Sequence, residues 1–175
     1  MRVRDHVVIS AAAAALAALP WGPRALGLWA GGVLIDVDHY VWYCLRQRRL
    51  NPVAAVRFFN QADPPTHSAT RALHSPVVLS AALIAGSRRR ALLPAAMGMA
   101  LHVALDVHHR VRMAKVRAAA LERDEFTCQA CGSTASGVRA YLLRQPLLLP
   151  SYKAADHVSL CDRCHETAHL GAKGT

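Results

Sequence analysis

Acidic residues are scarce in this chain of 175 residues. It has 11 Asp and Glu against 21 Lys and Arg, and its formal net charge is +10. A charge of this sign and size favours a polyanionic partner, which is either nucleic acid or the anionic face of a membrane. Charge alone does not choose between these two partners.

Cysteine is rare and almost confined to two C-x-x-C pairs, while the fifth residue, Cys44, lies alone in an apolar stretch. This arrangement argues against a disulfide framework and predicts a metal site in a reducing compartment. Two such pairs present four thiolates in a tetrahedron, which suits Zn²⁺ and replaces most of the core of a small module. We predict a structural zinc, with no open position for chemistry, within about 123–169. Its ligands are Cys128, Cys131, Cys161 and Cys164.

The chain also lacks an unbroken apolar run of the roughly 20 residues that a membrane span requires. Its apolar residues, 53% of the total, gather in four segments, each of which predicts a helix because it is long, rich in Ala and Leu, and bounded by Pro, Gly or Arg. These segments are Val7 to Trp21, Ala25 to Leu45, Pro76 to Gly86, and Ala91 to Val107. We expect a bundle partly sunk in a membrane, with the last two helices as a re-entrant pair. A soluble helical bundle is the alternative.

Three further features set the expected organisation. The first 21 residues imitate a signal peptide, but Asp5 and His6 lead the apolar run, so a retained helix is expected. Residues 51–71 are polar and broken by Pro64-Pro65, which predicts a helix and then a loop that brings His67 and His74 toward the next helix. At Val107 the composition changes to the basic run HHRVRMAKVR. The predicted domains are therefore 1–109, which is helical, and 110–175, a basic linker helix with the zinc module.

Ionisable residues recur at helical spacing in the apolar part. Asp36 and His39 are three residues apart, and His102 and Asp106 are four apart, so each pair shares a helical face. Burying such groups in apolar helices costs free energy unless they pair with one another or bind a metal ion. Carboxylates and imidazoles together suit Zn²⁺, Mn²⁺ or Fe²⁺, which activate water for hydrolysis. The four residues are expected to converge on one such ion.

Each of these residues taken alone is more often a hydrogen-bonded core group, but as a set they favour a metal site. The predicted ligands of this second divalent metal are His6, Asp36, Asp38, His39, His74, His102 and Asp106. The predicted catalytic residues among them are Asp36, Asp38, His39, His102 and Asp106.

These motifs resemble the membrane-bound metal-dependent hydrolase family. The likeness covers about 1–107 and rests on His6, on GGVLIDVDH from Gly31 to His39, on His74-Ser75, and on His102-x3-Asp106. The resemblance implies a helical protein of a bacterial-type inner membrane, with the zinc module facing the cytoplasm. It also implies hydrolysis of a phosphate or other ester with metal-activated water.

The stretches AALERDEFTCQACG and VSLCDRCHETAH resemble an HNH-endonuclease module, over roughly 117–170. The resemblance implies a ββα fold with zinc in its knuckles, and a separate catalytic metal held by a first-strand histidine and a terminal helix histidine. The latter maps to His169, after His165, and Asp156 stands in place of the middle asparagine. The first histidine is missing, since none lies between Gly132 and Asp156. Without that base we predict a module that binds and does not cleave.

The sequence thus predicts a mainly α protein: a membrane-associated helical bundle followed by a small ββα-type zinc module. The predicted function is that of a metal-dependent hydrolase, with a basic linker and a zinc module that bind nucleic acid or lipid headgroups. The basic linker residues are Arg110, Arg112, Lys115 and Arg117. Two alternatives stay open, namely an HNH endonuclease anchored by its helices and a non-catalytic adaptor between a membrane and nucleic acid.

Overall fold

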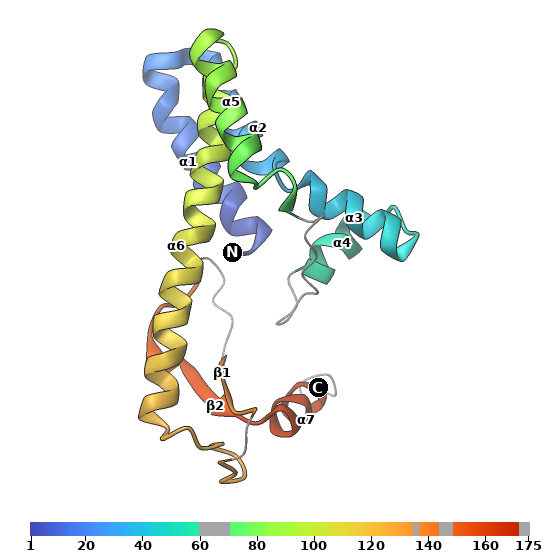
Figure 1. The fold of residues 1–175 in the computed structure, drawn as a ribbon, viewed down its shortest axis with the longest axis vertical. Helices are drawn as coiled ribbons and strands as arrows, with labels where there is room; N and C mark the ends of the chain where they lie inside the picture. The colour runs from blue at the N-terminus through green and yellow to red at the C-terminus, as the bar shows by residue number, and fades with distance from the viewer. Residues whose placement is uncertain (60–70, 135–136, 144–148, 172–175) are drawn as a thin grey trace. The chain divides into compact units, whose positions relative to one another are not determined.

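The computed structural model is mainly helical, with one small two-stranded sheet (Figure 1). It describes residues 1–59, 71–134, 137–143 and 149–171, and side chains of the last helix up to Thr167. His67 and the side chain of His169 lie outside this part of the chain. The chain forms two compact units, Met1–Val107 and His108–Thr175.

The first unit is built from helices that pack closely on one another. They are α1 (Val3–Trp21), a short 3-10 turn η1 (Gly22–Ala25), α2 (Leu26–Leu34), α3 (Val37–Gln47), α4 (Pro52–Phe59), α5 (Pro76–Arg88) and the start of α6 (Leu93–Arg123). The chain reverses between α1 and α2 at Gly22, whose φ of +56° suits glycine, and the following Pro23 lies in the first turn of η1. The resulting α1–α2 hairpin lies beside α6, and α5 precedes α6 in a second hairpin (Figure 1).

The segment predicted as one helix over Ala25–Leu45 is two helices, which are separated at Ile35 and Asp36. In an unbroken helix, residues two apart point about 200° away from each other, so Asp36 and Asp38 would face opposite sides. The turn lets both carboxylates approach the same polar cluster. Beyond it, α3 pairs with α4, where the Tyr40 hydroxyl donates to the Leu50 carbonyl at 2.7 Å.

The fourth predicted helix, Ala91–Val107, continues without a break through the basic run and ends at Arg123. The run consists largely of Ala, Arg, Lys and Met, which favour helix, and contains neither Gly nor Pro. The basic linker is therefore part of a 31-residue helix whose second half belongs to the second unit.

Glycines let α2 lie unusually close to its neighbours. A Cβ atom on Gly31 would collide with the Ala95 backbone of α6, and one on Gly98 would collide with the Leu28 carbonyl of α2. A Cβ on Gly32 would overlap the Ser10 hydroxyl of α1. Because backbone atoms cannot move aside as side chains can, these contacts fix the spacing of α1, α2 and α6.

Gly98→Ala should therefore destabilise the helical unit by about 1–3 kcal/mol, the usual cost of overpacking a tight core. A thermal melt of the full chain would measure this, and Ala104→Ser on the exposed face of α6 is the matched control. Equal melting temperatures for the two variants would show that the α2–α6 contact is looser than the structure has it.

The second unit contains an antiparallel pair of strands, β1 (Arg139–Leu142) and β2 (His157–Leu160), followed by α7 (Asp162–Gly171). A short 3-10 turn, η3 (Ala154–Asp156), precedes β2. The end of α6 is tied to β2, because Arg123 donates to the carbonyl of His157 and the Asp124 carboxylate accepts from the amide of Ser159. These bonds explain why an Arg-Asp pair precedes the first cysteines.

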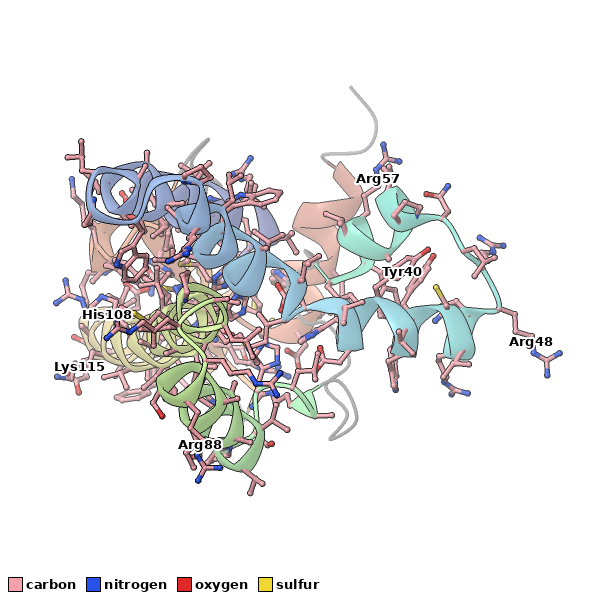
Figure 2. The ribbon with its side chains drawn as sticks, turned by 90° about the horizontal axis from the view of Figure 1, so that it is seen from above. Tyr40, Arg48, Arg57, Arg88, His108 and Lys115 are labelled. Atoms are coloured by element: carbon pink, nitrogen blue, oxygen red, sulfur yellow. The ribbon has the colours of Figure 1, made fainter. Side chains whose placement is uncertain are left out.

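One helical stretch among the described residues, Val3–Gln47, is long and apolar enough to cross a membrane. Signal sequences and core helices of soluble proteins share this length and composition. Several of its leucines are largely exposed, with Leu19 at 90% and Leu16 at 74%. Basic side chains project outward near helix ends of the same unit, at Arg48, Arg57 and Arg88 (Figure 2).

Candidate metal centres

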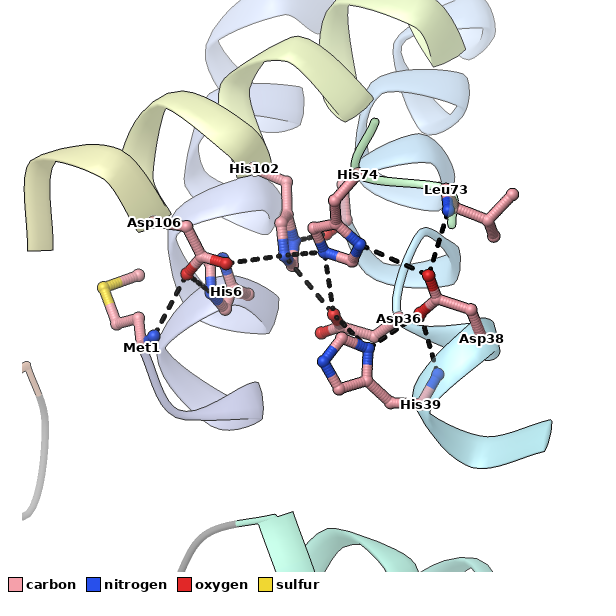
Figure 3. A network of polar contacts seen from close by, with 10 residues as sticks. Met1, His6, Asp36, Asp38, His39, Leu73, His74, His102 and Asp106 are labelled. Atoms are coloured by element: carbon pink, nitrogen blue, oxygen red, sulfur yellow. Dashed lines mark hydrogen bonds and ion pairs between the residues drawn. The ribbon is translucent and has the colours of Figure 1, made fainter. Parts of the chain in front are cut away.

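Seven histidine and aspartate side chains meet inside the helical unit (Figure 3). They come from four places in the chain: α1, the α2–α3 junction, the turn before α5, and α6. All seven are residues that the sequence singled out, namely His6, Asp36, Asp38, His39, His74, His102 and Asp106. Ligation of an ion by them stays a prediction.

The seven side chains form three overlapping triads whose ligand atoms lie within 4.8 Å of one another. The α6 triad is His6, His102 and Asp106. The middle triad is Asp36, His74 and His102. The α3 triad is Asp38, His39 and His74. Each triad has two imidazoles and one carboxylate, a set that hydrolytic zinc enzymes and non-haem iron enzymes use while leaving positions open.

Both histidines of the α6 triad are buried. His6 and His102 are 2% and 0% exposed, and their rings stack with centroids 3.7 Å apart. The Asp106 carboxylate lies 3.0 Å from His6 Nε2 and 3.7 Å from His102 Nε2. The amino group of Met1 donates to the same carboxylate at 3.0 Å.

Asp36 stands at the centre of the cluster. Its Oδ1 atom lies 3.3 Å from His74 Nε2, 3.4 Å from His102 Nε2 and 3.6 Å from His39 Nδ1. Asp38 lies on the far side of His74, with Oδ1 2.7 Å from His39 Nδ1 and Oδ2 3.4 Å from His74 Nδ1. The four residues expected to share one ion, Asp36, His39, His102 and Asp106, are thus distributed over the three triads.

Backbone groups orient the ligands, and sequence patterns gave no signal for them. His102 Nδ1 lies 2.7 Å from the Gly32 carbonyl, so that nitrogen donates and Nε2 offers its lone pair to the cluster. The Leu73 amide donates to Asp38 Oδ2 at 3.0 Å. The first bond joins α6 to α2, and Gly31 in the GGVLIDVDH stretch allows the close approach of these two helices at Ala95.

The cluster carries an excess of negative charge that a cation would offset. Burial alone would lower the pKa of His74, but the carboxylates of Asp36 and Asp38 raise it to about 9. His74 therefore binds a proton near neutral pH. A divalent ion would replace that proton, and the buried Nδ1 of His6, which has no hydrogen-bond partner among the described residues, fits a ligand set.

The four cysteines of the second unit also converge. Their sulfur atoms lie within 4.8 Å of one another, and those of Cys131 and Cys161 are 3.9 Å apart. Zn–S bonds of about 2.3 Å in a tetrahedron place sulfurs roughly 3.8 Å apart. Gly132, with a φ of +72°, closes the first knuckle by donating its amide to the Cys128 carbonyl.

The thiols differ in how readily they ionise. Backbone amides, that of Cys161 foremost, donate to Cys128 and lower its pKa to about 6. The neighbouring thiols, Cys161 and Cys131 first, raise the pKa of Cys164 to about 12. Four thiolates so close together would require a cation, and one zinc ion would supply the positive charge.

Three other polar residues of the second unit, His165, Asp156 and His157, make contacts of their own. His165 stacks on Tyr141 with ring centroids 3.5 Å apart, and Asp156 contacts the Ser151 hydroxyl. His157 is 1% exposed, with Nδ1 3.0 Å from the Lys153 carbonyl. Within the part of this unit that the structure describes, the four cysteines are the only metal-binding cluster.

Comparison of the chain with family models, with curated proteins and with solved structures finds no match.

Proposed function

We propose that this protein is a membrane-associated, metal-dependent hydrolase that works through the His/Asp cluster of its helical unit. The observation that carries the proposal is that seven ligating side chains from four parts of the chain meet there as linked triads. A histidine that is simply hydrogen-bonded in a core needs one hydrogen-bond partner. In this cluster, by contrast, several imidazoles contact the same carboxylate. Such sharing is typical of sites that hold cations.

The chain's own residues have distinct tasks in this proposal. Nε2 of His6 and Nε2 of His102 face Asp106, and Asp36 links His102 to His74. These groups would hold Zn²⁺, Mn²⁺ or Fe²⁺. A divalent ion in such a set acts as a Lewis acid and lowers the pKa of water, which supplies hydrolytic chemistry near neutral pH. Burial of His6 and His102 restricts water to the open side of the cluster.

Membrane association is supported by the apolar surface of the α1–α2 hairpin. Besides its exposed leucines, the hairpin has an apolar groove of about 630 Å³, lined by alanines of α1 together with Leu26 and Trp29. Exposed apolar surface of this extent is typical of contact with lipid or with a partner. The proposed location is a bacterial-type inner membrane, with the zinc module on the cytoplasmic side.

The proposal is tested on the full chain, stripped of metal and reloaded with Zn²⁺, Mn²⁺ or Fe²⁺. We expect p-nitrophenyl phosphate, bis(p-nitrophenyl) phosphate or p-nitrophenyl acetate to be hydrolysed only after reloading. Metal content should exceed the one zinc of the cysteine site. A chain that binds one zinc and no other metal would instead be the non-catalytic adaptor.

For the second unit we propose binding of nucleic acid or another polyanion through the basic half of α6. Arg110, Arg112, Lys115 and Arg117 are all exposed. Helical periodicity places Arg110 and Arg117 on one face, and Arg112 and Lys115 nearly opposite. Arg112 also lies over the Tyr152 ring, 5.5 Å from its centroid.

Binding to DNA should be sequence-indifferent and sensitive to salt. If all four basic residues contact phosphates, affinity should fall roughly 100-fold between 50 and 200 mM salt. Fluorescence anisotropy with a labelled duplex would measure it, comparing Arg110→Ala/Arg117→Ala with Arg112→Ala/Lys115→Ala to find the binding face. Affinity that ignores salt would contradict the proposal. Metal-dependent nicking of plasmid DNA that is lost in His169→Ala would instead support an anchored HNH endonuclease.

A further inference from the structure

We propose that the His/Asp cluster holds two divalent ions at once, one in the α6 triad and one in the α3 triad, with Asp36 between them. This inference rests on the proposed function and adds to it the number of ions and the class of substrate. Its basis is how the three triads share their members.

The α6 triad and the α3 triad have no residue in common. The middle triad shares His102 with the first and His74 with the second. Because His102 Nδ1 is engaged by the Gly32 carbonyl, only Nε2 can bind, and its single lone pair serves one ion. An ion in the middle triad would therefore exclude an ion from the α6 triad.

His74 likewise can serve only one ion, either in the middle triad or in the α3 triad. It faces Asp38 through Nδ1 and Asp36 through Nε2, at 3.4 and 3.3 Å. To serve both the α3 triad and the middle triad, its ring would have to lose its last N–H proton. The arrangement in which the most side chains bind metal, with no imidazole shared between two ions, places one ion in the α6 triad and one in the α3 triad, which are the outer triads.

Asp36 is the residue that both outer triads approach. Its Oδ1 lies 3.4 Å from His102 of the α6 triad and 3.3 Å from His74 of the α3 triad. A carboxylate has two oxygens and can serve two ions at once. In this arrangement Asp36 is a bridging ligand that strengthens the binding of both ions, while each ion keeps the three ligands of its own triad.

Charge then indicates the substrate. Three carboxylates with neutral imidazoles and the Met1 amino group, which contacts Asp106, carry two net negative charges, so a single divalent ion leaves the cluster neutral, whereas two ions make it cationic. A cationic centre attracts an anion, and paired ions stabilise both the attacking and the leaving oxygen of a phosphoryl transfer. The substrate class that fits two ions is a phosphate ester, in preference to an uncharged carboxylic ester.

The test loads the full chain with Mn²⁺ while zinc occupies the cysteine site, and measures manganese by mass spectrometry and electron paramagnetic resonance. Wild type should bind two Mn²⁺ with the spectrum of a coupled pair, and inorganic phosphate should perturb that coupling. His6→Ala and Asp38→Ala should each bind one Mn²⁺ with an isolated six-line spectrum. Asp36→Asn should bind two Mn²⁺ more weakly and with less coupling.

Occupancy of the middle triad alone predicts the opposite pattern. Wild type would then bind one Mn²⁺, His6→Ala and Asp38→Ala would keep it, and Asp36→Asn would lose it. That result overturns the two-ion inference and leaves the hydrolase proposal standing, whereas no Mn²⁺ in wild type overturns both. Asp106→Ala tests the α6 triad if His6→Ala fails to fold, and zinc content with circular dichroism reports folding of every variant.

Discussion

Cys161→Ser should abolish zinc binding and unfold the module that contains β1, β2 and α7, while α1 to α5 stay helical. The reason is that this module buries few apolar side chains, so the free energy of zinc binding, of order 10–16 kcal/mol in small zinc modules, is its free energy of folding. Cys161 sits between the first cysteine pair and α7, and its amide donates to Cys128. Cys161→Ser keeps that amide but removes one of the four sulfur atoms that meet at the site, so the two cysteine pairs can no longer complete a tetrahedron around zinc.

Limited trypsin digestion of the full chain, read by mass spectrometry, would measure this unfolding. We expect rapid cleavage at Arg139 and Lys153 in Cys161→Ser or after chelation, and slow cleavage in the zinc-loaded wild type. Cys44→Ser, in α3 and apart from the other cysteines, is the matched control and should behave like wild type. An intact module in the zinc-free chain would refute the structural role of the metal.

His102→Ala should remove the ion of the α6 triad from the His/Asp cluster, keep the zinc of the cysteine site, and lower hydrolysis by at least about 100-fold. His102 belongs to two of the three triads, is fully buried, and is held by the Gly32 carbonyl, so no neighbour can take its place. Loss of a metal ligand or of its orienting partner typically costs 10–100-fold in metal affinity or activity, and loss of a shared ligand costs more.

The matched control is His108→Ala, because His108 lies on the same helix, is exposed, and belongs to none of the triads. Metal content and hydrolysis should be those of wild type in the control. Since a buried histidine also contributes to packing, His102→Gln provides a variant of closer volume. Unchanged metal content in both His102 variants would mean that the cluster is a hydrogen-bonded core and that the hydrolase proposal is wrong.

Local patterns anticipated the mainly helical fold better than the course of its helices. Alanine- and leucine-rich segments predict helices whatever their surroundings, and α1, α5 and α6 overlap the predicted segments. The break at Asp36 was not anticipated, since periodicity does not reveal that two carboxylates must face one cluster. The length of α6 was underestimated because the change to a basic composition was taken as a domain boundary between the fourth helix and a separate linker helix.

The sequence by itself determined the candidate ligands, because imidazoles, thiols and carboxylates are set by residue type and their i, i+3 and i, i+4 spacing by helical geometry. Only the tertiary structure decided how those residues are grouped into the three triads. His6 and His102 are far apart in the chain, and their stacking depends on glycines that bring α2 against α1 and α6. The orientation of His102 depends on a backbone carbonyl, a group that every residue carries and no sequence pattern marks. Because of long-range packing, the residues that were predicted to form one ion site form three triads that share members.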